Sequence, residues 1–196
     1  MKSSYLRAGA ALACALALSA CGGGDGDRVI GGSFSGVTKP GLVLQNNGGS
    51  DLPITPTSVG IGEFYFPNMV ETDSDYHVTV KSPPSNADNC TVTNAKGRVA
   101  IDITNIHVAC TIRQHELKGT VTGLTGNNLV LVNGSDRVPV AAGATSFTMA
   151  KVNEDAPYGI AILTQPDNQT CTVANGTGTV GQADITNVTV SCGPRT

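Results

Sequence analysis

Residues 90–110 read CTVTNAKGRVAIDITNIHVAC, and residues 171–192 read CTVANGTGTVGQADITNVTVSC. Both segments begin with Cys-Thr-Val, contain Asp-Ile-Thr-Asn and end on a cysteine. Residues outside the two segments keep the same spacing, since Tyr76 and Tyr158 lie 82 positions apart. Self-similarity at a nearly fixed spacing marks a repeat. The sequence therefore predicts a tandem duplication in which both copies share one fold.

Four of the six cysteines lie at the ends of these two segments. Four cysteines can pair in three ways. The duplication favours Cys90–Cys110 and Cys171–Cys192, because each copy then closes itself. A closed loop of about 20 residues contributes roughly 3 kcal/mol in the chain-entropy description. Four buried free thiols are the alternative.

The apolar residues of the repeated segment change phase partway along. Alternate residues are apolar from Val99 to Ile103, and the alternation resumes one step out of phase from Ile106 to Ile112. A side-chain period of two cannot skip a residue without a bulge or a turn. The sequence predicts that interruption at Thr104-Asn105 and Thr186-Asn187, where asparagine tolerates left-handed backbone.

The first twenty residues are typical of an export signal. Lys2 and Arg7 precede an apolar stretch, Ala8 to Leu18, which is too short to span a bilayer as a helix. Leu18-Ser-Ala-Cys21 follows, and this resembles the lipobox of bacterial lipoproteins. The resemblance implies cleavage before Cys21 and lipidation of Cys21, and several acyl chains would anchor the protein stably to a membrane. An ordinary secretory signal with an incidental cysteine is the alternative.

The segment after the lipobox is predicted to be a flexible tether. Residues 21–31 are rich in glycine and offer little apolar surface to bury. Asp25 and Asp27 are interpreted as solvated charges rather than metal ligands. Lipoproteins of enteric bacteria that lack aspartate directly after the lipidated cysteine are sorted to the outer membrane. Gly22 follows Cys21 here, so the resemblance implies an envelope location, at the outer membrane.

The rest of the chain is predicted to be all-β. With 24 glycines, 10 prolines and no tryptophan, it suits short strands joined by turns, and no amphipathic helical stretch is present. About seven strands per copy favour two small antiparallel β-sandwiches with one disulfide each. We assign the first to residues 32–112 and the second to 113–192, with a polar joint at Arg113–Glu116 and a tail at 193–196. Leu52–Val59 contains prolines and is at most an edge strand.

The repeat resembles Cys-paired β-sandwich repeats of secreted and lipid-anchored bacterial surface proteins. The second copy carries this pattern in Val121-Thr-Gly-Leu-Thr-Gly-Asn-Asn-Leu129 and in Gln165-Pro-Asp-Asn-Gln-Thr-Cys171. The first copy departs from it at Phe34 and Lys39-Pro40. Likeness to immunoglobulin-like and transthyretin-like sandwiches is an analogy of fold.

The patterns that could carry nucleotide or nucleophile chemistry have structural interpretations. Gly176-Thr-Gly-Thr-Val-Gly181 matches a dinucleotide-binding pattern, but a strand pattern follows it where a helix is needed, so we interpret it as a hairpin turn. Gly32-Ser-Phe-Ser35-Gly36 is not a nucleophile elbow.

The titratable residues likewise form no recognised site. His77, His107 and His115 have no zinc-ligand spacing. Glu71, Asp73 and Asp75 could hold Ca²⁺ weakly, although a solvated loop is favoured, and the second copy offers only Glu154-Asp155.

Asp102 and Asp184 are carboxylates at equivalent positions of the two copies. We interpret them as acceptors for backbone amides of turns rather than as general acids.

The sequence thus predicts no catalytic residue, cofactor or metal, and it favours a non-catalytic, lipid-anchored envelope protein. The formal net charge is −3 without a basic run, which argues against nucleic acid as a partner. The expected partners are the membrane, through the lipid, and a protein or glycan bound by the sandwiches in adhesion or protein–protein contact. The alternatives are a periplasm-facing accessory lipoprotein and an enzyme, such as a hydrolase, with an unrecognised site.

Overall fold

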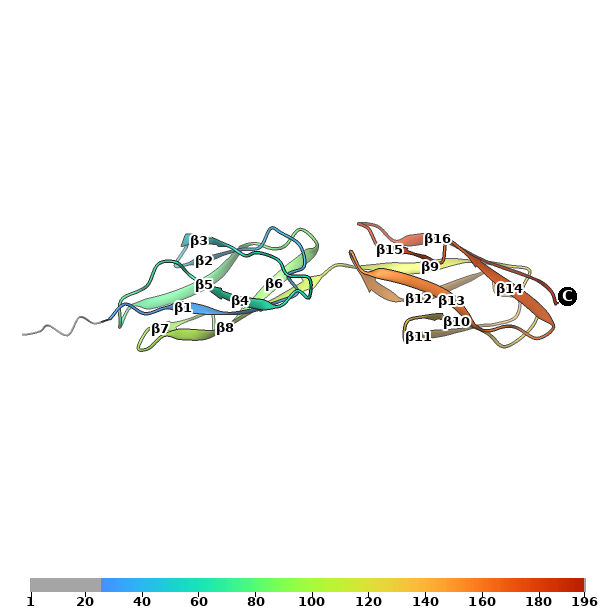
Figure 1. Ribbon diagram of the computed structural model, residues 1–196, viewed down its shortest axis with the longest axis horizontal. Coiled ribbons are helices and arrows are strands. Elements are labelled where there is room, and N and C mark those ends of the chain that lie inside the picture. The colour runs from blue at the N-terminus through green and yellow to red at the C-terminus, as the bar shows by residue number, and fades with distance from the viewer. Residues whose placement is uncertain (1–25, 196) are drawn as a thin grey trace, which may run out of the picture.

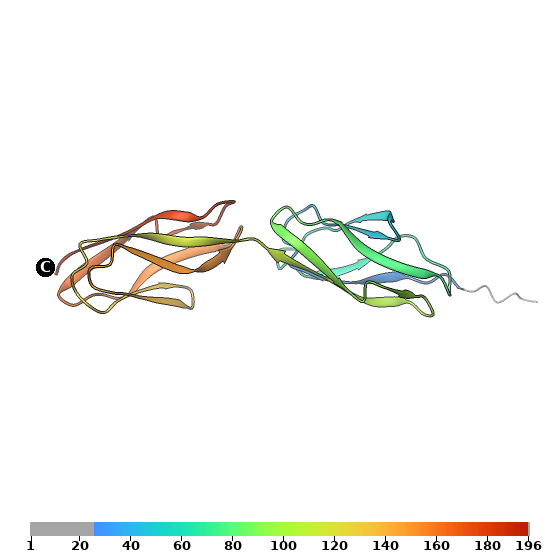
Figure 2. The same cartoon turned by 180° about the vertical axis from the view of Figure 1, so that it is seen from behind.

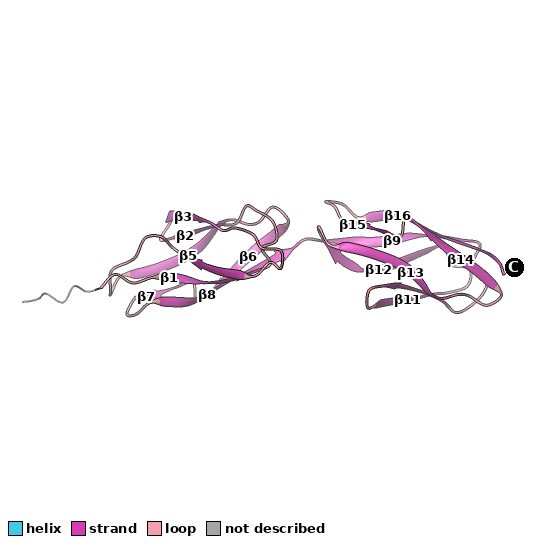
Figure 3. Cartoon of the chain, in the orientation of Figure 1, coloured by secondary structure: helices cyan, strands magenta, loops and turns pink. Residues whose placement is uncertain are grey.

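The computed structural model describes residues 26–195, in which sixteen strands and no helix occur. The strands form two β-sandwich modules, β1–β8 and β9–β16, that lie end to end (Figures 1 and 3). The view from behind shows the same elongated arrangement, with the first described residues and the C-terminus at opposite ends (Figure 2). Within residues 26–195, therefore, no helical segment is present that could cross a membrane.

The first module consists of two four-stranded sheets. Its strands are β1 (Ile30–Ser35), β2 (Val43–Asn46), β3 (Gly49–Pro53), β4 (Gly62–Tyr65), β5 (Asp75–Ser82), β6 (Ala87–Thr93), β7 (Lys96–Arg98) and β8 (Ile103–Ile112). One sheet has the order β4-β1-β8-β6 and the other β3-β2-β5-β7. The strand β3 lies at a sheet edge, where its one proline, Pro53, is tolerated.

The second module repeats this topology strand for strand. Its strands are β9 (Gln114–Thr122), β10 (Leu129–Asn133), β11 (Asp136–Val140), β12 (Ser146–Asn153), β13 (Pro157–Thr164), β14 (Gln169–Ala174), β15 (Thr177–Thr179) and β16 (Ile185–Pro194). The sheet orders β12-β9-β16-β14 and β11-β10-β13-β15 follow from the first module by adding eight to each strand number. The all-β fold with two tandem sandwiches is confirmed.

Each module has one more strand than the sequence predicts. The additional strands, β7 and β15, are three residues long, and all of their residues are exposed, so they lack the apolar alternation that reveals a strand. Each carries a glycine opposite a tyrosine: Gly97 pairs with Tyr76 and Gly178 with Tyr158. A Cβ on Gly178 would lie 2.9 Å from the Tyr158 ring. A glycine at this position leaves room for the tyrosine ring beside the strand.

The glycine-rich segment of the second copy is therefore not the hairpin turn that the sequence predicts. It carries the chain from β14 in one sheet to β15 in the other, through Asn175 and Gly176. Asn175 has a φ of 54°, and its counterpart Asn94 has a φ of 52°. The left-handed backbone belongs to this crossing, where a short polar side chain can adopt it.

The predicted interruption of the last strand is a β-bulge in both modules. Strand β1 is parallel to β8, and the register shifts between Ile30 paired with Ile103 and Gly32 paired with Ile106. The same shift occurs between β9 and β16. The expected left-handed backbone at Asn105 and Asn187 is wrong. Instead, the left-handed Asn94 donates its side-chain amide to the Asn105 carbonyl at 2.8 Å.

Each module has its own apolar core between its two sheets. In β8 the alternate residues Ile106 and Val108 are fully buried, and in β16 the equivalents Val188 and Val190 are also buried. The core is made mainly of aliphatic side chains, with one edge-on aromatic pair, Phe64 and Phe66, in the first module. The bulge places Ile106 and Val108 in this core, whereas Thr104 and Asn105 at the start of β8 remain exposed.

The predicted disulfide pairing is confirmed. Cys90 in β6 bonds Cys110 in β8, and Cys171 in β14 bonds Cys192 in β16. In each pair the two cysteines are direct cross-strand partners, with Cα atoms 4.0 Å apart. Each disulfide therefore fastens the last strand of a module to a neighbouring strand in the same sheet.

The duplicated aspartates bind backbone, although not in a turn. The carboxylate of Asp102 accepts a hydrogen bond from the Val29 N–H at 3.0 Å, and that of Asp184 accepts one from the Glu116 N–H at 2.8 Å. Each aspartate thus joins the start of the last strand to the start of the first strand of its module.

Replacing a cysteine pair by alanine should destabilise mainly the module that contains it. We expect the double variant C90A/C110A to lose about 3 kcal/mol of unfolding free energy in the first module, because the denatured chain is no longer cross-linked. Guanidinium denaturation followed by a probe in each module measures this loss. The matched variant C171A/C192A should shift the second module instead. Equal shifts of both modules in either variant would contradict this assignment.

Removing the Asp102 or Asp184 carboxylate should weaken the pairing of first and last strands. We expect D102A and D184A each to cost about 1 kcal/mol, the value of one hydrogen bond to backbone. D102N and D184N keep an acceptor oxygen and should cost less. Amide exchange at Val29 and Glu116 reports the lost bonds directly, and unchanged protection in D102A would count against this role.

Candidate functional site at the joint between the modules

A single residue, Arg113, separates the last strand of the first module from the first strand of the second. Strand β8 ends at Ile112 and β9 begins at Gln114. The Arg113 N–H donates to the Asn86 carbonyl at 3.0 Å, and the Arg113 carbonyl accepts from the Glu154 N–H at 2.8 Å. The backbone of the linking residue is therefore bonded to one module through its donor and to the other through its acceptor.

The Arg113 side chain repeats this connection. Its Nε donates to Glu154 Oε2 of the second module at 2.8 Å. Its two terminal nitrogens donate to carbonyls of the first module, Nη1 to Ala87 at 3.4 Å and Nη2 to Ser85. A guanidinium suits this position because its donors are fixed in a plane and can engage several acceptors at once.

Glu154 is the buried carboxylate of the joint, with 5% of its side chain exposed. Its Oε2 atom also lies 3.4 Å from His115 Nε2, and His115 Nδ1 lies 3.8 Å from Asp184. The hydrogen bond from Arg113, and to a smaller extent the one from His115, lowers the pKa of the Glu154 carboxyl below its usual 4.5 against the opposing effect of burial. The same bond raises the pKa of Arg113.

A second polar contact crosses the joint beside the first. Asp155 Oδ1 lies 3.3 Å from Lys39 Nζ, and Asp155 Oδ2 accepts from Asn86 Nδ2 at 3.3 Å. Asn86 is 1% exposed, and its amide also donates to Thr38 Oγ1 at 3.0 Å. The Glu154-Asp155 corner of the second module therefore fits against the end of the first module through both carboxylates. Chemically, this arrangement fixes orientation, because every charge in it is bound to another part of the protein.

The sequence predicts a polar joint at Arg113–Glu116 but not this network. Gln114, His115 and Glu116 belong to β9, which leaves Arg113 as the connection. Glu154 and Asp155 are considered from the sequence only as possible calcium ligands. A pairing between residues 41 positions apart has no periodic signal, and the two adjacent carboxylates Glu154-Asp155 between β12 and β13 are the available indication.

The other predicted sites remain separate from this one. Cys21, the predicted lipidation site, and Asp25 lie outside the described residues. In the acidic loop, Asp73 pairs with Arg98 at 3.2 Å. In residues 26–195 no three histidine, cysteine, aspartate or glutamate side chains lie together as metal ligands would. His77 lies on an exposed position of β5.

His107 takes part in a hydroxyl cluster that the sequence does not predict. Its ring lies on the outer face of the first module, with Nδ1 2.9 Å from Ser33 Oγ and Nε2 3.3 Å from Ser35 Oγ. A serine bound to a histidine is the start of a catalytic triad, but the third member must be an acceptor that orients the ring. Here both ring nitrogens meet hydroxyls, and the cluster lies on a sheet surface. It can bind polar groups but is not arranged as a triad.

Searches for related proteins identify no family for the chain. No family model matches it, and no curated protein does. Among solved structures, the Bacillus anthracis TIE protein is 15% identical with a TM-score of 0.44, over 84% of this chain and 34% of that one, so the chain spans about a third of its length.

Two further similar structures are a pilin and two repeat units of a collagen binding protein. The major pilin T3.2 of Streptococcus pyogenes is 11% identical with a TM-score of 0.37, over 86% of this chain and 98% of that one. Two B repeat units of the collagen binding protein of Staphylococcus aureus are 15% identical with a TM-score of 0.31, over 86% and 50%. Identities and TM-scores this low transfer no function to this chain.

The joint should loosen in acid. The contribution of Glu154 is fully present above its unfolded pKa and disappears as the pH falls through its lowered folded pKa, because protonation removes the charge that Arg113 binds. We expect a fixed orientation of the modules at pH 7 that broadens as the pH is lowered progressively below 4.5, measured by small-angle scattering. The variant E154Q should be loose throughout this pH range. A wild-type profile that does not change with pH would contradict this role.

Proposed function

We propose that the protein is a non-catalytic spacer and display protein of the bacterial cell envelope, anchored by lipid at Cys21. The observation that carries the proposal is the one-residue joint at Arg113, whose N–H and carbonyl are bonded to opposite modules. A joint without slack keeps the two modules in line, so the second module is held away from the end that carries the anchor (Figure 1). Catalysis needs no such alignment, whereas a spacer that holds its exposed surfaces in a fixed orientation does.

The N-terminal segment supports the envelope location. A lipobox ending at Cys21 would supply several acyl chains, which give stable anchoring where one chain does not. The predicted tether at residues 21–31 is wrong in its second half, since Arg28 forms a β-bridge with Val70 and Ile30 is fully buried in β1. The glycine-rich composition that precedes Arg28 would still favour a loose connection to the anchor. The two disulfides suit a compartment outside the reducing cytosol. We place the anchor in the outer membrane on the basis of Gly22.

The modules would bind through exposed surfaces rather than a pocket. Of the six large apolar side chains that are strongly exposed in residues 26–195, four lie in β4 or its flanking loops: Val59, Ile61, Tyr65 and Met69. Since β4 is also an edge strand, its backbone groups are available to a partner on one side. This combination favours adhesion or protein–protein contact by the first module.

Whole-cell experiments test anchoring and display together. We expect metabolic labelling with a clickable fatty acid to mark the wild-type protein and not C21A, which should leave the membrane fraction. We also expect protease added to intact cells to remove epitope tags on the second module.

Each failure has a distinct meaning. Unlabelled wild-type protein would overturn the lipid anchor. Full protection of a labelled protein on intact cells, with digestion only after the outer membrane is opened, would overturn display and place the protein on the periplasmic side.

A further inference from the structure

The end of the second module that faces away from the joint resembles the end of the first module at which Arg113 is bound. The Arg195 N–H donates to the Asn168 carbonyl at 3.1 Å, as the Arg113 N–H does to the Asn86 carbonyl at 3.0 Å. Both pairs differ by 82 positions, which is the spacing of the repeat. Arg195 therefore occupies the place in the second module that Arg113 occupies in the first.

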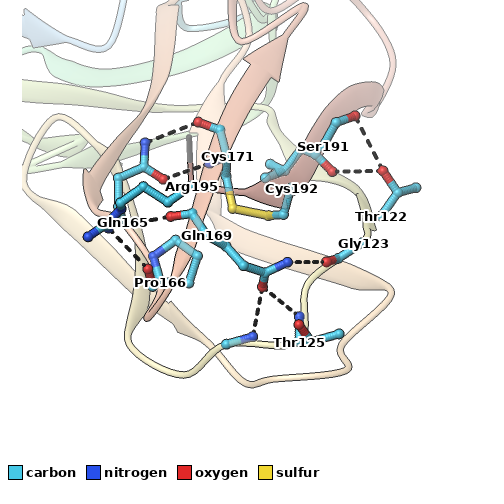
Figure 4. The surroundings of a disulfide bond; sticks show 12 residues. Thr122, Gly123, Thr125, Gln165, Pro166, Gln169, Cys171, Ser191, Cys192 and Arg195 are labelled. Carbon is cyan, nitrogen blue, oxygen red and sulfur yellow. Dashed lines mark hydrogen bonds between the residues drawn. A yellow bond between two sulfur atoms is a disulfide. The ribbon is translucent and has the colours of Figure 1, made fainter.

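The side chain of Arg195 is also held in the manner of Arg113. Its Nη2 atom donates to the carbonyls of Pro166 and Gln169, each at 3.4 Å (Figure 4). Gln169 is the equivalent of Ala87, whose carbonyl binds the Arg113 guanidinium. Arg113 uses its remaining Nε to bind Glu154, whereas Arg195 is exposed and has no carboxylate within salt-bridge distance among residues 26–195.

A polar pocket of about 490 Å³ lies at this end of the second module. Its lining includes Thr125, Gly126, Asp167, Asn168 and Pro194. The equivalent region of the first module, around Thr38, is where Asp155 is bound across the joint. The place that Asp155 occupies against the first module is thus a solvent-accessible pocket in the second module.

The open site differs from the filled one in charge. Gly126 stands in the place of Lys39, so the cation that binds Asp155 in the joint has no counterpart. Gln169 instead fixes this loop, because its Oε1 accepts from the Thr125 and Gly126 amides at 2.8 and 2.7 Å. The surface therefore keeps one cation, that of Arg195, and one carboxylate, that of Asp167, which already accepts from the Asn128 amide at 3.0 and 3.2 Å.

We propose that this face, defined by Arg195 and the pocket beside it, docks the acidic end of a further β-sandwich module. The partner would present a glutamate whose carboxylate binds Arg195 Nε and whose amide N–H binds the Arg195 carbonyl, as Glu154 does at the joint. The first module of a second copy does not fit this description. It has Thr72 in the position of Glu154, and the Thr72 hydroxyl is bonded to the Gly26 carbonyl at 2.9 Å.

A three-module chain tests the docking face and does not depend on the lipid anchor. Residues 114–195 are appended directly after Arg195, which places Arg195 where Arg113 stands and supplies a second Glu154 corner. Spin labels attached at non-cysteine sites give distance distributions across both joints. We expect the distribution across the new joint to be as narrow as that across the native one.

Variants separate docking from mere tethering. R195Q, or E154Q in the appended module alone, should broaden the new distribution at least twofold and leave the native one unchanged. R137Q, which removes an exposed arginine elsewhere on the second module, should change neither. A broad distribution across the new joint of the unsubstituted chain, or a narrow one that R195Q does not affect, would overturn the proposal.

Discussion

The structure depends on the pairing of the first and last strands of each module. The last strand, β8 or β16, lies between the first strand and the disulfide-bonded strand of its sheet. It carries the bulge and one cysteine, and the aspartate that binds the backbone at the start of the first strand directly precedes it. Because both terminal strands lie in the interior of the sheet, the chain enters and leaves each module through its best-supported strands. One residue then suffices to join the modules end to end.

Features that act locally along the chain could be predicted from the sequence. The cysteine spacing indicates the disulfides, and the phase change beside Thr104-Asn105 indicates the bulge, because both leave a regular trace in the order of residues. The short strands β7 and β15 leave none. Their residues are exposed, and their position is set by a tyrosine ring on another strand. The anchor at Cys21 remains a prediction.

The joint could not be predicted, for a related physical reason. Arg113 and Glu154 become neighbours only when β9 and β12 pair. The order of residues along the chain therefore gives no indication of their ion pair. The duplication hides it further, since the position of Glu154 in the first module is held by Thr72. Only the alignment of the two copies on their common fold shows that Arg113 and Arg195 are equivalent.

The parallel pairing of β1 and β8 determines how each module would respond to tension. A force that pulls the two ends of the protein apart draws β1 and β8 past one another in opposite directions. Their hydrogen bonds, which run across the direction of pulling, then share the load and must break together rather than one after another. If β1 separated, the bond between Cys90 and Cys110 would still keep the intervening loop from extending. A chain built in this way resists stretching and lengthens only in part.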